Sequence, residues 1–202
     1  MDFWNRFAGL YDLAEALNGK VYREMTAITA RLVPRGAKVL DCAAGTGELS
    51  IAAAKKAESV LCTDNSEGML KVAEKKAKDR RLKNISFEQR NIFHLSEEDG
   101  YFDVVIAGNV LHLLDDPEAA VRELYRVTKK GGRILLPTFT LENSRLITEL
   151  MLSIYKKLGF DPSTEYSPKS YVEMLRKTGC GTVKAKLIRG MIPCCYGVII
   201  KD

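Results

Sequence analysis

The chain has 202 residues, of which 46% are hydrophobic and 28% charged, as is typical of one ordinary globular domain. No apolar run approaches the ~18–20 residues that a bilayer span requires. The stretch 1–17 contains acidic residues and has no cleavable apolar core, so we expect no secretory signal. The net charge of +5 is spread along the chain rather than concentrated in a tail.

The cysteines, at positions 42, 62, 180, 194 and 195, are odd in number and show no metal-ligand spacing. We therefore expect neither a disulfide framework nor a metal site, and we expect a cytoplasmic protein. Cys194 and Cys195 are adjacent in a strand-like run, where neighbouring side chains point to opposite faces. The pair is poorly suited to hold one ion.

The densest basic stretch, 71–83, has apolar residues interleaved near helical spacing. This pattern favours a solvated helix face over a patch for nucleic acid or an anionic membrane.

Helical material over 1–33 precedes an alternation of short strands and helices, and we expect it to pack beside the sheet or over its ligand cleft. Apolar runs rich in β-branched residues predict strands at 38–42, 59–63, 84–88, 102–107 and 133–136. Helical spacing predicts helices over 47–57, 66–80, 116–129 and 142–158. Such alternation indicates a parallel sheet with helices on both faces.

Boundary signals are clearest for the helix predicted over 116–129. Asp115 or Asp116 can cap its start, and Pro117 suits its first turn. The glycine pair at 131–132 is expected to end it.

The tail follows another pattern. After a helix predicted over 168–178, the runs TVKAKLIRG and PCCYGVIIKD are separated only by Met191 and Ile192. That gap is too short for a parallel crossover, so these strands should form an antiparallel pair at one sheet edge. We expect one α/β domain over 1–202, with a doubly wound, mostly parallel seven-stranded sheet. Its parts are an N-terminal helical segment (1–33), a core (34–140) and a region of helices and antiparallel strands (141–202).

The stretch VLDCAAGTGELS at 39–50 places a glycine turn directly after the first predicted strand, where doubly wound sheets bind cofactors. A phosphate-binding P-loop needs a lysine directly after its last glycine, and here the next lysine is Lys55. A dinucleotide fingerprint needs a third glycine where this chain has Ser50, which weakens that interpretation without excluding it.

A third interpretation fits better. Asp41 ends the first predicted strand, and Asp64 ends the second. A carboxylate about 20 residues after the glycine turn can accept hydrogen bonds from both ribose hydroxyls. Asp41 could favour a cationic cofactor group, directly or through water. An adenosine ribose, a cationic tail and no phosphate describe S-adenosylmethionine.

Five blocks in order resemble the motifs of class I S-adenosylmethionine-dependent methyltransferases, over nearly the whole chain. They are VLDCAAGTGELS, CTDNSEGML, RNIFHL, YFDVVIAGNVLHLLDD and LYRVTKKGGRILLPTF. Within that family, RFAGLYD at 6–12 resembles the opening of the ubiquinone/menaquinone-biosynthesis methyltransferases. The resemblance implies a Rossmann-like fold and S-adenosyl-L-methionine as cofactor, with S-adenosyl-L-homocysteine as product.

The resemblance also assigns roles to residues. Tyr11 would belong to a helical lid over the cofactor, or else pack the N-terminal helix. Met69 and Ile92 would flank the adenine, unless both are simply core. The full expected cofactor set is Tyr11, Asp41, Ala43, Gly45, Gly47, Asp64, Asn65, Met69, Asn91, Ile92 and Asn109.

Some of these roles have structural alternatives. Asp64 could instead cap the helix that starts near Ser66. Asn91 stands where the family often has an aspartate, and its carbonyl can still accept a hydrogen bond. Asn109 is expected near the methionine end or the acceptor.

Methyl transfer from a sulfonium needs a base only when the acceptor must lose a proton. Of the two histidines, His112 is the better candidate for that base, and its alternative role is to shape the pocket. His94 is expected to be structural.

We therefore expect a methyltransferase that acts on a small, partly apolar acceptor, as a monomer or homodimer without nucleic acid. One alternative acceptor is a lipid headgroup or quinone, reached by transient contact with a membrane surface. Another alternative is a module that binds the cofactor without transferring its methyl group.

Overall fold

The computed structural model describes residues 18–140 and 164–202. Tyr11 and the helix expected over 142–158 lie outside the described residues. The described chain forms one seven-stranded sheet with the order β3-β2-β1-β4-β5-β7-β6. The strands are β1 Lys38–Cys42, β2 Ser59–Asp64, β3 Ile85–Gln89, β4 Phe102–Ile106, β5 Thr128–Phe139, β6 Thr182–Ile188 and β7 Cys194–Ile200.

The first five strands pair in parallel, and β7 pairs antiparallel with both β5 and β6. The predicted fold class, including the antiparallel C-terminal pair, is therefore confirmed. The order reverses between β1 and β4, because β2 and β3 lie on one side of β1 while later strands lie on the other. In doubly wound sheets this reversal marks the ligand crevice.

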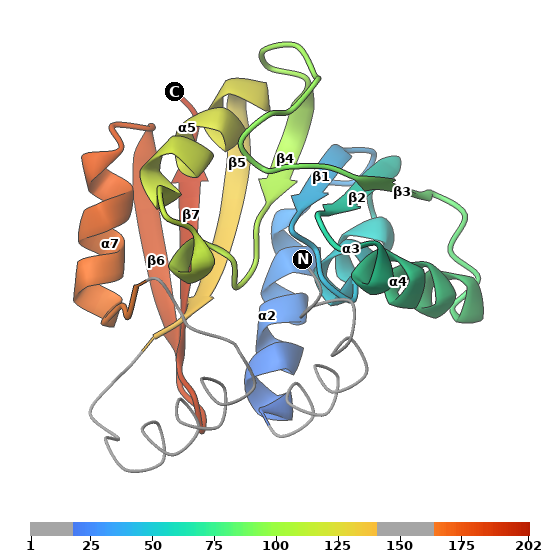
Figure 1. Cartoon of the computed structure of the whole chain (residues 1–202), viewed down its shortest axis with the longest axis horizontal. Helices are drawn as coiled ribbons and strands as arrows, with labels where there is room; N and C mark the ends of the chain where they lie inside the picture. The colour runs from blue at the N-terminus through green and yellow to red at the C-terminus, as the bar shows by residue number, and fades with distance from the viewer. Residues whose placement is uncertain (1–17, 141–163) are drawn as a thin grey trace.

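Helices cover both faces of the sheet, as Figure 1 shows with α7 beside β6 at one end and α4 beside β3 at the other. One apolar cluster joins the sheet to α5 and α7, a second joins it to α2 and α3, and a smaller third joins it to α4. The bounds are α2 Gly19–Leu32, α3 Glu48–Ala54, α4 Glu67–Asp79, η1 Leu111–Leu113, α5 Pro117–Val127 and α7 Pro168–Lys177.

Helix starts follow the capping signals in the sequence. The carboxylate of Asp116 accepts a hydrogen bond from the amide of Ala119 at 2.8 Å, and Pro117 occupies the first turn of α5. The Ser66 hydroxyl likewise accepts from the Met69 amide at the start of α4. These side chains satisfy amide groups that the first turn of a helix leaves unpaired.

The fifth strand differs from its prediction. A strand was expected only over 133–136 and a helix up to 129, but α5 ends at Val127 and β5 runs from Thr128 to Phe139. Thr128 pairs with Phe102, and the register shifts before Val104 pairs with Arg133. The extra residues between these pairs include Gly131, which has a φ of 74°. A local irregularity in the ladder thus lets the strand begin before the glycine pair.

The cysteines all lie within the described residues and are free, buried thiols. Cys194 belongs to the apolar cluster under α2, and Cys195 belongs to the cluster under α7. The two side chains therefore point to opposite faces, as the strand pattern predicts.

The start of α2 and the residue after β5 both form hydrogen bonds to the β6–β7 turn. The side-chain amide of Asn18, just before α2, donates to the carbonyl of Ile192 in the β6–β7 turn at 2.8 Å. The amide of Thr140, just after β5, donates to the carbonyl of Pro193 at 2.9 Å. The start of α2 therefore lies at the same sheet edge as the end of β5.

Candidate functional site

The loop after β1 is a glycine turn with a left-handed backbone. Ala43, Gly45 and Gly47 have φ values of 49°, 55° and 80°. Only glycine adopts such values at little cost. A Cβ atom added at Gly47 would lie 2.8 Å from the Cβ of Ala73 in α4, so the loop and α4 also pack too closely for a side chain. The close approach that the structure shows at Gly47 is made by α4 of the same chain, and approach by a cofactor stays a prediction.

Asp64 ties this turn to the end of β2. Its Oδ2 accepts a hydrogen bond from the Gly45 amide at 2.8 Å, and its Oδ1 accepts one from the Ser66 amide at 2.8 Å. Burial raises the pKa of Asp64, and the backbone amides of Ser66, Gly45 and Asn65 oppose that rise. Each carboxylate oxygen can accept a second hydrogen bond. Asp64 can therefore hold the start of α4 through Ser66 and still accept hydrogen bonds from a ribose diol.

Asp41 is fully buried at the end of β1. Its Oδ2 accepts a hydrogen bond from the Ser50 hydroxyl at 2.6 Å, and its Oδ1 is buried without a hydrogen-bond partner among the described residues. Burial raises its pKa to about 7, with a further contribution from the nearby Asp64 charge and opposition from Ser50. A buried carboxylate oxygen without a partner is costly unless a donor or cation completes it.

These observations fit S-adenosylmethionine. The buried Oδ1 of Asp41 suits the ammonium group of an amino-acid tail, and the Asp64 oxygens suit ribose hydroxyls. The left-handed turn between them lacks the lysine that directly follows the last glycine of a phosphate-binding P-loop. The residues present therefore fit the cofactor that the sequence motifs imply.

The residues expected around the adenine come from two loops that hydrogen bonds join. The side chain of Gln89 donates to the carbonyl of Asn65 at 2.9 Å, and the amide of Arg90 donates to the carbonyl of Asp64 at 3.1 Å. Asn91 is exposed, and its side-chain oxygen accepts from the Phe93 amide at 3.0 Å. The turn after β3 is thus held against the turn after β2.

Met69 and Ile92 are both buried, with 2% and 8% of their surfaces exposed. Ile92 packs in the apolar cluster under α5, so its core role is present in the structure. Their contact with an adenine remains a prediction.

Asn109 connects the ends of β4 and β5. Its amide donates to the carbonyl of Pro137 at 2.8 Å, and its side-chain oxygen accepts from the Phe139 amide at 3.1 Å. Its φ of 53° is unusual for a residue with a side chain. This conformation places Asn109 at the same sheet edge as the glycine turn.

His112 lies in the short helix η1 that follows β4. Its carbonyl accepts a hydrogen bond from the amide of Thr164, which leads into α7. Burial lowers its pKa to about 4, so the imidazole is neutral near pH 7. His94 lies away from it, exposed on the loop that faces α5.

Three contacts near the site were not predicted. Lys76 of α4 donates to the hydroxyl of Thr46 in the glycine turn at 2.9 Å, and it pairs with Glu48 at 3.1 Å. Tyr22 of α2 and Phe139 of β5 meet edge to face, with ring centroids 5.7 Å apart. No local sequence signal joins partners so far apart along the chain.

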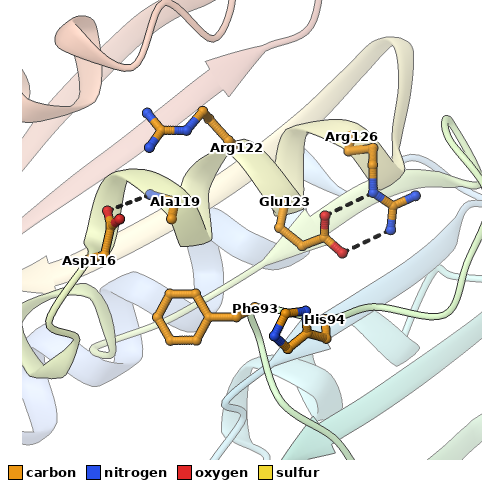
Figure 2. A pocket seen from close by; sticks show the side chains of 7 residues that line it. All are labelled: Phe93, His94, Asp116, Ala119, Arg122, Glu123 and Arg126. Atoms are coloured by element: carbon orange, nitrogen blue, oxygen red, sulfur yellow. Dashed lines mark hydrogen bonds and ion pairs between the residues drawn. The ribbon is translucent and has the colours of Figure 1, made fainter.

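A surface pocket lies between α5 and the loop that carries Phe93 and His94, as Figure 2 shows. Glu123 and Arg126 pair across it at 2.8 Å, and Arg126 also donates to the carbonyls of Leu95 and Glu97. These bonds fasten the loop before β4 to α5. The pocket does not include the glycine turn or either site carboxylate; its lining residues are Phe93, His94, Asp116, Ala119, Arg122, Glu123 and Arg126.

Comparisons with known proteins agree with this site. A family model described as a methyltransferase domain matches residues 34–177. The ubiquinone/menaquinone biosynthesis C-methyltransferase UbiE of a Shewanella species is 38% identical over 130 residues, which are 62% of this chain and 50% of the relative. UbiE of Yersinia enterocolitica is 30% identical over 167 residues, 79% of this chain and 64% of the relative. The chain thus spans about half to two thirds of the length of these curated relatives.

Solved structures share the fold. A methyltransferase in complex with the Haloferax volcanii Trm112 methyltransferase activator superimposes with a TM-score of 0.80 at 17% identity, covering 100% of this chain and 97% of that one. A SAM-dependent methyltransferase of Thermotoga maritima gives a TM-score of 0.75 at 19% identity, with coverage of 100% and 99%. With its sheet order, its glycine turn and the family match over residues 34–177, this chain belongs to the class I S-adenosylmethionine-dependent methyltransferases and is similar to UbiE.

Proposed function

We propose that this protein transfers the methyl group of S-adenosylmethionine to a small, partly apolar acceptor by in-line displacement. The observation that carries the cofactor assignment is the buried Oδ1 of Asp41, which has no hydrogen-bond partner among the described residues. A carboxylate in that position, beside a glycine turn without the P-loop lysine, suits a cationic amino-acid tail. Membership of the methyltransferase family supports the same reaction.

S-adenosylmethionine, when bound, supplies an electrophilic methyl group and a neutral leaving group. The protein therefore contributes mainly by positioning the reactants. In this assignment Asp41 holds the ammonium group, Asp64 accepts from the ribose hydroxyls, and Ala43, Gly45 and Gly47 present backbone to the methionine part.

The remaining cofactor contacts come from the neighbouring loops. Asn65 and Asn91 border the adenosine, Met69 and Ile92 flank the adenine, and Asn109 lies toward the methionine end. Well-oriented reactants can lower a barrier by ~7–11 kcal/mol, which leaves little for chemical assistance to supply.

The acceptor end of the site is assigned to the edge near Asn109, Tyr22 and Phe139. The two rings are half-buried and meet edge to face beside the carboxyl end of β5. Aromatic walls bury large apolar area at low entropic cost. They therefore support an acceptor with a planar, apolar portion, such as a phenol-like ring.

His112 is assigned as the group that takes a proton when the acceptor is acidic. Its low pKa keeps the imidazole neutral near neutral pH, with one ring nitrogen able to accept a proton, but it also makes the imidazole a weak base. Its contribution should therefore fall at the lower end of the usual range. An acceptor that needs no deprotonation would not use His112.

A quinone-ring acceptor is the second candidate, because the curated relatives are named ubiquinone/menaquinone biosynthesis C-methyltransferases. Such an acceptor is lipid-soluble and would be reached at a membrane surface, as a lipid headgroup would. In the described part of the chain, no helix has the length and apolarity that crossing a membrane demands.

The test has two arms. In the first, S-adenosylhomocysteine at ~100 times its Kd should stabilise the protein by ~2.7 kcal/mol, seen as a rise of several degrees in Tm. In the second, phenol, thiol and amine acceptors and a short-chain quinol are screened with isotopically labelled S-adenosylmethionine.

Transfer to the soluble phenols would support the leading proposal. Transfer only to the quinol, with co-sedimentation on anionic vesicles, would favour the membrane alternative. A folded protein that shows no Tm shift with S-adenosylhomocysteine would contradict both.

A further inference from the structure

Ser50 is a buried polar residue in the first turns of α3, and its side chain faces the sheet. It is 0% exposed, and its Oγ donates to Oδ2 of Asp41 at 2.6 Å. Ser50 is the third residue of α3, and a serine inside a helix can compete with the helical hydrogen bonds of the backbone. Its side chain here instead donates a hydrogen bond to the carboxylate of Asp41 in β1.

The surroundings of Asp41 make this hydroxyl important. The titratable groups that face the carboxylate are Asp64, Cys62, Cys42 and Tyr196. Each of these is neutral or negative, so none of them offers a positive charge to the carboxylate. Ser50 is the side chain that the described structure shows donating to the Asp41 carboxylate.

The two carboxylate oxygens therefore have different roles. One oxygen is bound to Ser50, and the other is buried and without a hydrogen-bond partner among the described residues. A carboxylate held at one oxygen by a short, charge-assisted hydrogen bond cannot rotate to hide the other. The orientation of the second oxygen depends on the first.

We propose that Ser50 is a positioning residue of the cofactor site: its hydroxyl holds the ionised Asp41 so that Oδ1 receives the ammonium group of the adenosyl cofactor. This role rests on the cofactor assignment made above. Ser50 itself touches neither the cofactor nor the reacting atoms.

Through the pair of Ser50 and Asp41, cofactor binding depends on the protonation state of the Asp41 carboxyl. Burial raises the pKa of Asp41 to about 7, and the Ser50 hydrogen bond opposes that rise. An ammonium group binds the ionised carboxylate, so the affinity for the cofactor should increase as pH rises through the pKa of Asp41. Below that pKa, cofactor binding should release the proton of the Asp41 carboxyl. Loss of the hydroxyl raises the pKa of Asp41 further and moves the whole transition upward.

The test is calorimetric titration of S-adenosylhomocysteine into the wild type and Ser50→Ala between pH 6 and 8.5. If the pKa of Asp41 rises by about one unit, Ser50→Ala should bind about ninefold more weakly at pH 6 and within about twofold of wild type at pH 8.5. Ser50→Thr keeps the hydroxyl and should restore the wild-type profile. A role confined to packing would weaken binding equally at every pH.

Thr63→Val provides a matched control, because the buried Thr63 hydroxyl contacts the backbone carbonyl of Asp41, at 3.3 Å, and not its carboxylate. Its effect on affinity should be the same at all pH values. Carbon-13 NMR titration of the Asp41 carboxyl in ligand-free protein, assigned with Asp41→Asn, reads the pKa without any cofactor. If Ser50→Ala fails to fold, Ser50→Cys keeps the volume with a weaker donor and should show an intermediate shift.

A pH-independent defect in Ser50→Ala, or an unchanged Asp41 titration, would overturn the role of Ser50 while leaving the cofactor assignment intact. Absence of binding by the wild-type protein would overturn the cofactor assignment and this role together. The two failures are therefore distinguishable.

Discussion

The backbone amide of Gly45 and the carboxylate of Asp64 form a 2.8 Å hydrogen bond that joins the loop after β1 to the end of β2. The second oxygen of Asp64 accepts from the Ser66 amide, which precedes α4. One side chain thus fixes the turn and the helix start on either side of the site. A change at Asp64 should therefore affect stability and cofactor binding together.

Asp64→Asn tests this connection. An asparagine keeps one acceptor oxygen, but its amide group would face a backbone N–H, leaving that donor unpaired at a cost of ~1–3 kcal/mol. We expect a Tm lower by several degrees and S-adenosylhomocysteine binding weakened ~10–100-fold, measured by thermal denaturation and calorimetry. Asp79→Asn, on the exposed end of α4, should change neither. Wild-type affinity in Asp64→Asn would contradict the ribose assignment.

The glycine turn gives a second prediction. Gly47→Ala combines a left-handed backbone with a Cβ only 2.8 Å from that of Ala73, so it should destabilise the protein by ~2–4 kcal/mol and reduce cofactor affinity. Gly36→Ala is the matched control, because Gly36 has a φ of 78° and an added Cβ would meet nothing within 4 Å. It should cost only the ~1 kcal/mol of the backbone conformation. Equal losses in urea denaturation of the two variants would show that close packing at Gly47 is unimportant.

Asp41 should make stability depend on pH. Its native pKa is raised to about 7, whereas an unfolded aspartate titrates near ~3.9. Between these values the native state binds one more proton than the unfolded state, so stability falls as pH rises. The ligand-free wild type should lose up to ~1.4 kcal/mol per pH unit relative to Asp41→Asn across this window, and nothing further above it. Urea denaturation at pH 5, 6, 7 and 8 measures this, and parallel curves for the two proteins would disprove it.

The role of His112 can be separated from cofactor binding. Because its pKa is lowered to about 4, its protonation should not shape the rate profile between pH 6 and 9. His112→Gln should lower kcat ~10–100-fold for a phenol or thiol acceptor while the Kd for S-adenosylhomocysteine stays within ~2-fold. His94→Gln, on the exposed loop by α5, should retain full activity. An unchanged kcat in His112→Gln would reject the role of base.

The aromatic pair predicts an effect on the acceptor alone. Phe139→Leu or Tyr22→Leu removes an edge-to-face contact and should raise KM for a ring-containing acceptor ~5–20-fold, with cofactor affinity unchanged. Tyr101→Leu removes an exposed ring at the opposite end of the strands and serves as control. Steady-state kinetics with varied acceptor would refute the assignment if KM were the same in all variants.

Much of this site was predictable from the sequence, because position along the chain determines position on the sheet. Asp64 is the last residue of β2 and Asp41 the last but one of β1, and the ends of neighbouring parallel strands meet at one edge. The glycines between them are required locally by the turn. Element type and order, the antiparallel tail and the cap at Asp116 followed from equally local patterns.

The remaining features depend on packing that no local pattern encodes. Ser50 looked like a missing third glycine, whereas its hydroxyl binds the carboxylate of Asp41. The pairing of Tyr22 with Phe139 requires α2 to cross the sheet to the end of β5. The length of β5 was underestimated because Gly131 and Gly132 read as a helix end, while the structure accommodates them within an irregular ladder.

Calorimetric titration of the wild-type protein at pH 8 with S-adenosylhomocysteine, and in parallel with NADH and ATP, tests the cofactor assignment most directly. We expect saturable heat at one site per chain with S-adenosylhomocysteine and none with the two phosphate-bearing nucleotides. Binding of NADH or ATP by folded protein that ignores S-adenosylhomocysteine would contradict it.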